Sequence, residues 1–143
     1  MIGSLMMCVS VVILLLGMLA GIAMGITQNF MLAPAHAHLN LVGGVLLFLF
    51  GLYYRLVPAA GTTALAKLQG SLHIAGGILF PAGVALVLLK GPSVEAAPIA
   101  GSLIVVTAMV LFAVIVFRTA RTTTYPEVLR RGAATERFPD RSC

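Results

Sequence analysis

Apolar residues fill four long stretches of the chain, and most of the charged residues follow the last of these stretches. Each stretch reaches or exceeds the roughly 20 residues that a helix needs to cross the hydrocarbon core of a bilayer. A helix is the expected form because backbone groups inside a bilayer must bond within their own segment. The pattern therefore predicts four spans, over residues 1–26, 31–57, 64–89 and 98–117.

The composition agrees with a membrane protein, since 60% of the 143 residues are hydrophobic and only 9% are charged. Too little sequence remains outside the spans for a separate soluble domain. We therefore predict an all-α integral membrane protein, with a four-transmembrane-helix bundle over residues 1–117. We expect membrane lipids as one of its partners. Residues 118–143 are basic and polar, and we expect a cytoplasmic tail without regular structure.

The net charge of +5 does not indicate nucleic acid, because the positive charges follow the membrane topology. Six of the seven arginines come after the last span, while Arg55 and Lys67 flank the turn between the second and third spans. The first loop has no Lys or Arg, and in the third Lys90 is offset by Glu95. The positive-inside rule then predicts that both termini are cytoplasmic, and we expect the chain in a bacterial inner membrane.

A few polar residues lie within the predicted spans, where an unpaired polar group is costly and is a functional candidate by default. Acidic residues occur only outside the spans, so no nucleophile, base and acid can converge inside the bundle. A hydrolase is therefore disfavoured, and no enzymatic reaction is assigned. The candidate cofactor-binding residues are His36, His38, Asn40, Gly44, Gln69 and His73.

His36 and His38 open the second span two residues apart. On a regular helix such residues diverge by about 200°, so the two rings would serve different sides. If the segment were extended before Leu39, both rings could bind one copper or zinc ion. Pro34 favours the helix, because proline is frequent in a first helical turn. A third alternative is that both rings only reach water at the interface.

His73 lies near the middle of the third span, one turn after Gln69 and among Gly70, Gly76 and Gly77. One interpretation is close helix packing, with His73 hydrogen-bonded to Gln69 or to a neighbouring helix. The other is that the missing side chains leave room for a flat prosthetic group that His73 contacts.

Two stretches of the chain resemble a known family. The sequence HAHLNLVGGVLLFLFGLYYRLVP, residues 36–58, is similar to the tenth helix of subunit I of haem-copper oxidases and nitric oxide reductases. The sequence AKLQGSLHIAGGILFP, residues 66–81, is similar to the eleventh helix, with Lys67, Gly76, Phe80 and Pro81 near matching positions. With the residues that precede and join them, the two stretches cover residues 34–81, a little over a third of the chain.

In that family the first histidine of the pair binds the high-spin haem and the second binds the low-spin haem. The resemblance thus implies that His36 and His38 are metal ligands and that the cofactor is haem b. Gln69 stands where the family often has His, and His73 is an additional histidine. The chain also lacks the helices that supply the copper ligands, the cross-linked tyrosine and the second low-spin ligand. It resembles a small stand-alone relative, not a complete oxygen reductase.

We therefore expect a haem-binding membrane protein for electron transfer or diatomic gas binding, with a quinol or a redox protein as partner. His38 and His73 should differ in depth by roughly 10 to 15 Å, which disfavours an intrachain ligand pair. A homo-oligomer could instead hold haem between His36 or His38 of adjacent chains. The alternatives are a copper-binding or assembly protein for a respiratory oxidase, and a cofactor-free subunit of a respiratory or other membrane complex.

Overall fold

The computed structural model describes the backbone of residues 2–135 and the side chains of residues 2–121. This part of the chain is helical between short turns and has no β-strand. Four segments are long and apolar enough to cross a membrane, which confirms the predicted number of spans. The elements are α1 (Ile2–Thr27), α2 (Ala33–His38), η1 (Leu39–Leu46), α3 (Leu47–Leu56), α4 (Pro58–Gly61), α5 (Ala64–Lys90), η2 (Pro92–Val94) and α6 (Ala96–Thr135).

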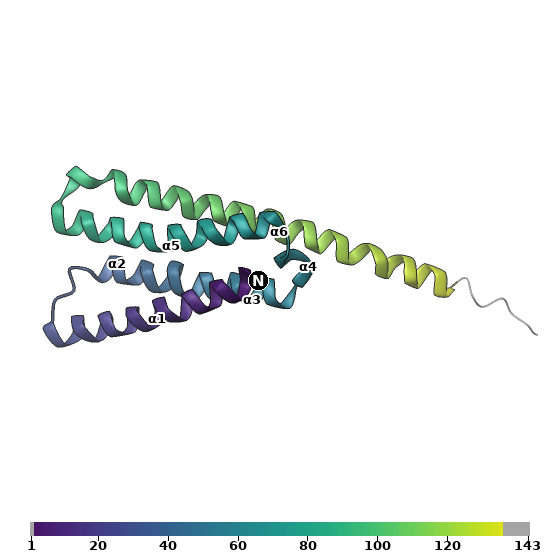
Figure 1. Cartoon of the computed structure of the whole chain (residues 1–143), viewed down its shortest axis with the longest axis horizontal. Helices are drawn as coiled ribbons and strands as arrows, with labels where there is room; N and C mark the ends of the chain where they lie inside the picture. Colours follow the sequence, from purple (N-terminus) through teal and green to yellow (C-terminus); the bar gives the residue numbers. More distant parts are fainter. Residues whose placement is uncertain (1, 136–143) are drawn as a thin grey trace, which may run out of the picture.

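The spans run antiparallel, and short turns join them at the two ends of the bundle (Figure 1). The second span is made of α2, η1 and α3 in continuous succession. It packs against α1 on one side and α5 on the other, and α6 packs chiefly on α5. The beginning of α1 therefore lies at the same end as α4, and residues 28–32 lie at the opposite end with η2.

The last helix is longer than the sequence pattern indicated. α6 begins at Ala96 and continues as helix through the basic segment to Thr135. The predicted boundary at residue 117 is thus not the end of the helix, and residues 118–135 do not have the irregular backbone that we expected. A run of polar residues ends a span but does not by itself end a helix, because the backbone can continue its own hydrogen bonds in water. Residues 136–143 lie outside the described part of the chain.

Local sequence explains where the central helix begins and ends. Thr63 caps the start of α5, and its side-chain oxygen accepts a hydrogen bond from the backbone N–H of Ala66 at 3.1 Å. Gly91 follows the last residue of α5 with φ of 80°, a conformation that glycine adopts without strain. These two residues fix the length of α5 and so the depth at which its polar residues lie.

Pairs of glycines let the helices approach each other closely. A Cβ atom on Gly3 would lie 2.7 Å from the carbonyl oxygen of Gly51, where α1 crosses α3. A Cβ atom on Gly43 would lie 2.7 Å from the carbonyl oxygen of Gly77, where η1 crosses α5. Small residues at crossings are the usual means by which membrane helices gain van der Waals contact.

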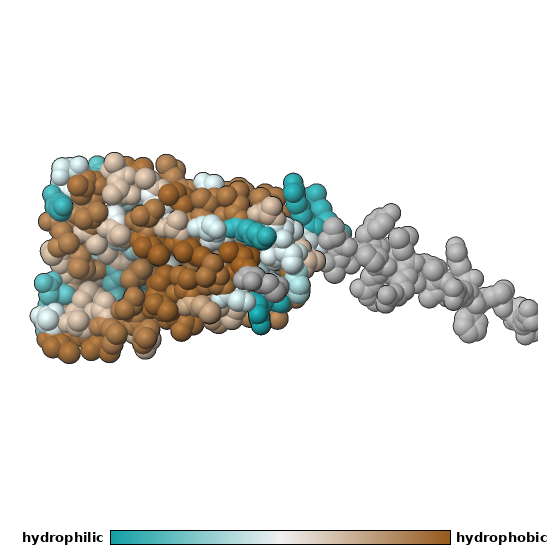
Figure 2. Space-filling view, in the orientation of Figure 1, coloured by the Kyte–Doolittle hydropathy of each residue, from teal (hydrophilic) through white to brown (hydrophobic). Residues whose placement is uncertain are grey.

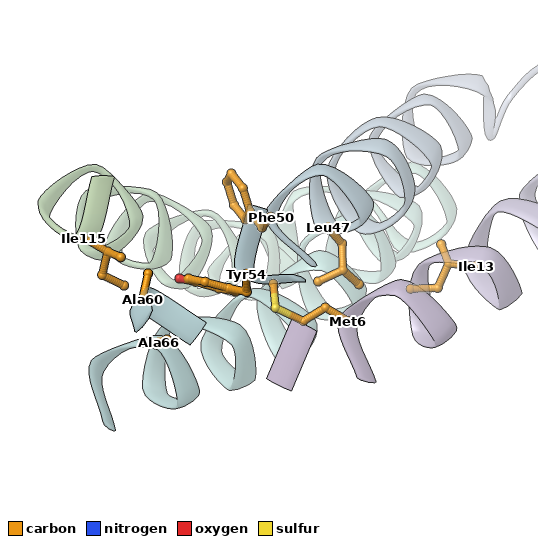
Figure 3. Packing of buried hydrophobic residues seen from close by; sticks show 8 residues of the cluster. All are labelled: Met6, Ile13, Leu47, Phe50, Tyr54, Ala60, Ala66 and Ile115. Carbon is orange, nitrogen blue, oxygen red and sulfur yellow. The ribbon is translucent and has the colours of Figure 1, made fainter. Parts of the chain in front are cut away.

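Apolar side chains cover the outside of the bundle, and hydrophilic ones collect at its two ends (Figure 2). Such a surface suits contact with lipid along the spans. Inside the bundle, toward the end that carries α4, buried apolar side chains from five helices form a cluster (Figure 3). Its buried members are Met6, Ile13, Leu47, Phe50, Tyr54, Ala60, Ala66 and Ile115.

Candidate functional site

The two neighbouring histidines lie on a helix and face different elements. Residues 33–38 form α2, so the extended segment that a shared metal ion would require is not present. The ring of His36 lies against Gly21 of α1, while the ring of His38 makes an edge-to-face contact with Phe80 of α5, with ring centroids 4.7 Å apart. Each ring therefore belongs to a separate environment.

Asn40 holds His36 in position against α1. The Asn40 side-chain amide nitrogen donates to the His36 carbonyl oxygen at 3.0 Å and lies 3.3 Å from each ring nitrogen of His36. The amide group fills the space that Gly17 leaves, and Gly21 leaves room for the imidazole itself. A Cβ atom on Gly21 would lie 3.1 Å from Cε1 of His36. Two α1 glycines thus accommodate the His36–Asn40 pair.

His36 lines a pocket of about 470 Å³ between α1, α2 and α5. This volume falls within the roughly 300 to 1,000 Å³ of ordinary small-molecule and cofactor sites. All the other side chains of the lining are apolar, so the imidazole is its one polar side chain. Four exposed wall residues, two from α1 and two from α5, belong to apolar spans, so the pocket opens on the side of the bundle between these two helices. They are Ala20, Ala23, Ile78 and Ala82.

His38 has one ring nitrogen committed to the backbone. Its Nδ1 lies 2.7 Å from the carbonyl oxygen of Pro34. Because a carbonyl can only accept, Nδ1 carries the proton and Nε2 keeps its lone pair. Metal-binding histidines are commonly oriented in this way, with the second nitrogen donating to a carbonyl or carboxylate. The residue is partly exposed.

His73 lies inside the bundle, and its surroundings favour the packing interpretation. Its Nε2 bonds to the carbonyl oxygen of Val42 at 3.1 Å, and the Phe50 ring meets it edge-to-face at 4.8 Å. The glycines beside it are covered by neighbouring helices. Gly70 lies against side chains of α1, and Gly76 lies against side chains of α6.

His73 also lies at a depth nearer to His38 than we expected. Val42, its hydrogen-bond partner, comes four residues after His38, which is about 6 Å along a helix. The position of a residue within its own span does not fix how two spans are aligned with each other. The hydrogen bond between His73 and Val42 shows that alignment directly. Even so, Nε2 of His73 is already bonded, and the ring is fully buried.

Gly44 and Gln69, the remaining candidates, lie away from the pocket. Gly44 faces α1, where its carbonyl oxygen accepts a hydrogen bond from Ser10 at 2.9 Å. Gln69 accepts a hydrogen bond from the Tyr54 hydroxyl at 2.9 Å inside the bundle. The candidates therefore separate into two groups. His36, His38 and Asn40 lie at one end of the bundle, and Gly44, Gln69 and His73 are buried inside it.

Sequence reasoning missed the walls of the pocket. Ala20 and Ala23 on α1, like Ala82 and Ala85 on α5, are small residues three apart on one helix face. Such pairs could have indicated a hollow, but small residues serve equally well at close crossings. Within the residues whose side chains are described, no three His, Cys, Asp or Glu side chains come together as a metal site.

Comparisons with protein-family models, with curated proteins and with solved structures give no match to this chain. The resemblance to subunit I of the oxidases therefore remains an expectation drawn from two short motifs.

Proposed function

We propose that the chain is a haem-binding membrane protein in which His36 binds the iron of haem b within the pocket between α1, α2 and α5. The observation that carries the proposal is an apolar pocket of about 470 Å³ with one imidazole in its wall. An apolar cavity with few polar groups is the usual form of a cofactor site, and imidazole is a common axial ligand of haem iron. The lining therefore offers one metal ligand and apolar walls for the macrocycle.

Each residue near the pocket has a distinct role in this proposal. His36 would supply a ring nitrogen to the metal, and Asn40 lies beside that ring, with its amide nitrogen 3.3 Å from each ring nitrogen. The alanines keep the walls flat, and the apolar lining excludes water. Bound haem supplies one-electron chemistry at the iron and a position for a diatomic gas. Met24 also lies in the wall, and its thioether is a potential second ligand.

A second haem position is proposed at His38, on the surface of the bundle. The hydrogen bond from Nδ1 to the Pro34 carbonyl oxygen prepares Nε2 to bind a metal, and the ring is partly exposed. A two-fold axis along the membrane normal would bring the same nitrogen of a second copy to equal depth. This arrangement requires a homo-oligomer, with the haem between chains.

The charge distribution supports the orientation of the site. Arg55 and Lys67 lie near α4, at the end where α1 begins. We infer that this end is cytoplasmic and that the pocket lies near the outer surface of a bacterial inner membrane. A quinol in the bilayer or a redox protein outside it is the corresponding electron-transfer partner. Participation in a larger respiratory complex is compatible with the same site.

The proposal is tested by optical spectra of the purified protein, oxidised and reduced, after expression with added haem precursor. We expect a Soret band, and His36→Leu should remove the part of it that belongs to the pocket haem, because the pocket then loses its one imidazole. His73→Leu is the matched control and should retain the band, since that ring is buried elsewhere. A protein that never shows a Soret band overturns the proposal.

The same preparations separate the two haem positions and the copper alternative. His38→Leu should retain the pocket haem and lose only a haem that is shared between copies. A shared haem also requires that the haem-loaded particle be larger than one chain. Metal analysis that finds copper lost with His38→Ala, and no haem, would favour an assembly role instead. A cofactor-free structural subunit predicts no change in complex assembly when both histidines become Leu.

A further inference from the structure

The centre of the bundle holds two buried polar atoms without a hydrogen-bond partner, and both belong to α5. Gln69 and His73 are fully buried. The side-chain nitrogen Nε2 of Gln69 and the ring nitrogen Nδ1 of His73 have no partner among the described residues. Buried polar groups are almost always hydrogen-bonded in folded proteins, so a pair of such atoms requires an explanation.

The hydrogen bonds that these residues do make fix what each remaining atom needs. Nε2 of His73 donates to the Val42 carbonyl oxygen, which leaves Nδ1 of the neutral ring as an acceptor. Oε1 of Gln69 accepts from the Tyr54 hydroxyl, which leaves the Gln69 amide nitrogen as a donor. The two atoms are complementary, but no direct hydrogen bond joins them in the described structure. A molecule between them must therefore accept from Gln69 and donate to His73.

The spacing along α5 favours one small partner for both atoms. Gln69 and His73 are four residues apart on one helix, so their side chains leave the same face one turn apart. An O–H group both accepts and donates, and water is the smallest molecule that offers one.

We propose that α5 holds one ordered water molecule between the amide nitrogen of Gln69 and Nδ1 of His73, at the centre of the bundle. The water completes a hydrogen-bonded chain that runs from Tyr54 on α3 through Gln69 and His73 on α5 to Val42 on η1. Phe50 closes the chain on one side by its edge-to-face contact with His73. The proposal does not depend on haem.

The test is infrared difference spectroscopy of the full-length protein in membranes, with exchange from ordinary water to water containing oxygen-18. We expect one isotope-sensitive O–H stretching band from a buried water in the unchanged protein and its loss in Gln69→Leu. Gln28→Leu is the matched control, because Gln28 is exposed in the loop after α1, and it should keep the band.

Gln69→Leu could lose the band because it misfolds, so a second measurement uses the unchanged protein. The nitrogen-15 resonance of His73 should show a protonated Nε2 and an unprotonated Nδ1 that accepts a hydrogen bond. An unprotonated Nδ1 without a hydrogen bond, or a buried-water band that persists in a folded Gln69→Leu protein, overturns the proposal. Both measurements can be made on haem-free protein, so they fail or succeed independently of the proposed cofactor.

Discussion

At the residue scale, the three histidines differ in what their ring nitrogens already bind. His36 faces a pocket, His38 has one nitrogen fixed by the Pro34 carbonyl oxygen, and His73 is enclosed with its Nε2 bonded. The sequence could identify all three as unusual at membrane depth. It could not rank them, because the neighbours that decide their availability come from α1 and α5, far away in the chain.

Two adjacent tyrosines allow a matched test of the central hydrogen bond. Tyr54→Phe removes the bond to Gln69 and leaves a buried carbonyl oxygen without a donor. We expect the free energy of unfolding to fall by about 1 kcal/mol, the order found for hydrogen bonds between membrane helices. Unfolding in mixed detergent micelles, followed by circular dichroism, measures it.

Tyr53→Phe is the control for that measurement. The Tyr53 ring packs on Phe112, and in the described part of the chain no hydrogen bond of its hydroxyl is found. Its stability should match that of the unchanged protein. An equal loss for both variants would mean that the hydrogen bond to Gln69 contributes nothing specific.

At the scale of elements, the spans follow from the sequence because hydrophobic length is a local property. The π-helix η1 does not, since the pattern of apolar residues over 39–46 fits an ordinary helix equally well. Two carbonyl oxygens of η1 accept hydrogen bonds from other helices, one from Ser10 and one from His73. We interpret η1 as stabilised by these tertiary contacts, which a reading of the sequence by segments does not contain.

Gly43 provides a test of how η1 meets α5. In Gly43→Ala the new methyl group would lie 2.7 Å from the Gly77 carbonyl oxygen, so the backbones must move apart. We expect a loss of about 1 to 3 kcal/mol in the free energy of unfolding, the usual cost of overpacking. The same detergent titration measures it.

Gly25→Ala is the matched control on α1. No atom lies within 4 Å of the position that its Cβ would take, and alanine is a better helix former than glycine by about 1 kcal/mol. This variant should be as stable as the unchanged protein or slightly more stable. If both alanine variants unfold alike, the close crossing at Gly43 does not contribute to stability.

At the scale of the whole molecule, the order and packing of the helices do not determine which end of the bundle faces the cytoplasm. That orientation is inferred from the distribution of charged residues. Single cysteines can test this after Cys8 and Cys143 are replaced by Ser. We expect Asn29→Cys, in the loop after α1, to react with a membrane-impermeant maleimide in spheroplasts. Thr62→Cys, beside α4, should react only after permeabilisation. The reverse labelling would contradict the proposed orientation.

The fold class was predictable from hydropathy alone, whereas the pocket was not. The pocket depends on how far apart α1 and α5 lie beside α2, which is a property of the packed bundle and not of any one segment. The length of α6 was missed for the opposite reason, because polarity predicts where a span leaves the membrane but not where its helix ends.

The opening of the pocket between α1 and α5 has a kinetic consequence. Exposed Ala20, Ala23, Ile78 and Ala82 line it, and all four belong to apolar spans. In the proposed orientation a molecule that enters between these spans first dissolves in the lipid, so partitioning sets the concentration that the site experiences. Apolar gases such as nitric oxide and oxygen accumulate in hydrocarbon, whereas ions are excluded from it. Under the proposed function, the bilayer itself would therefore select for uncharged, apolar molecules.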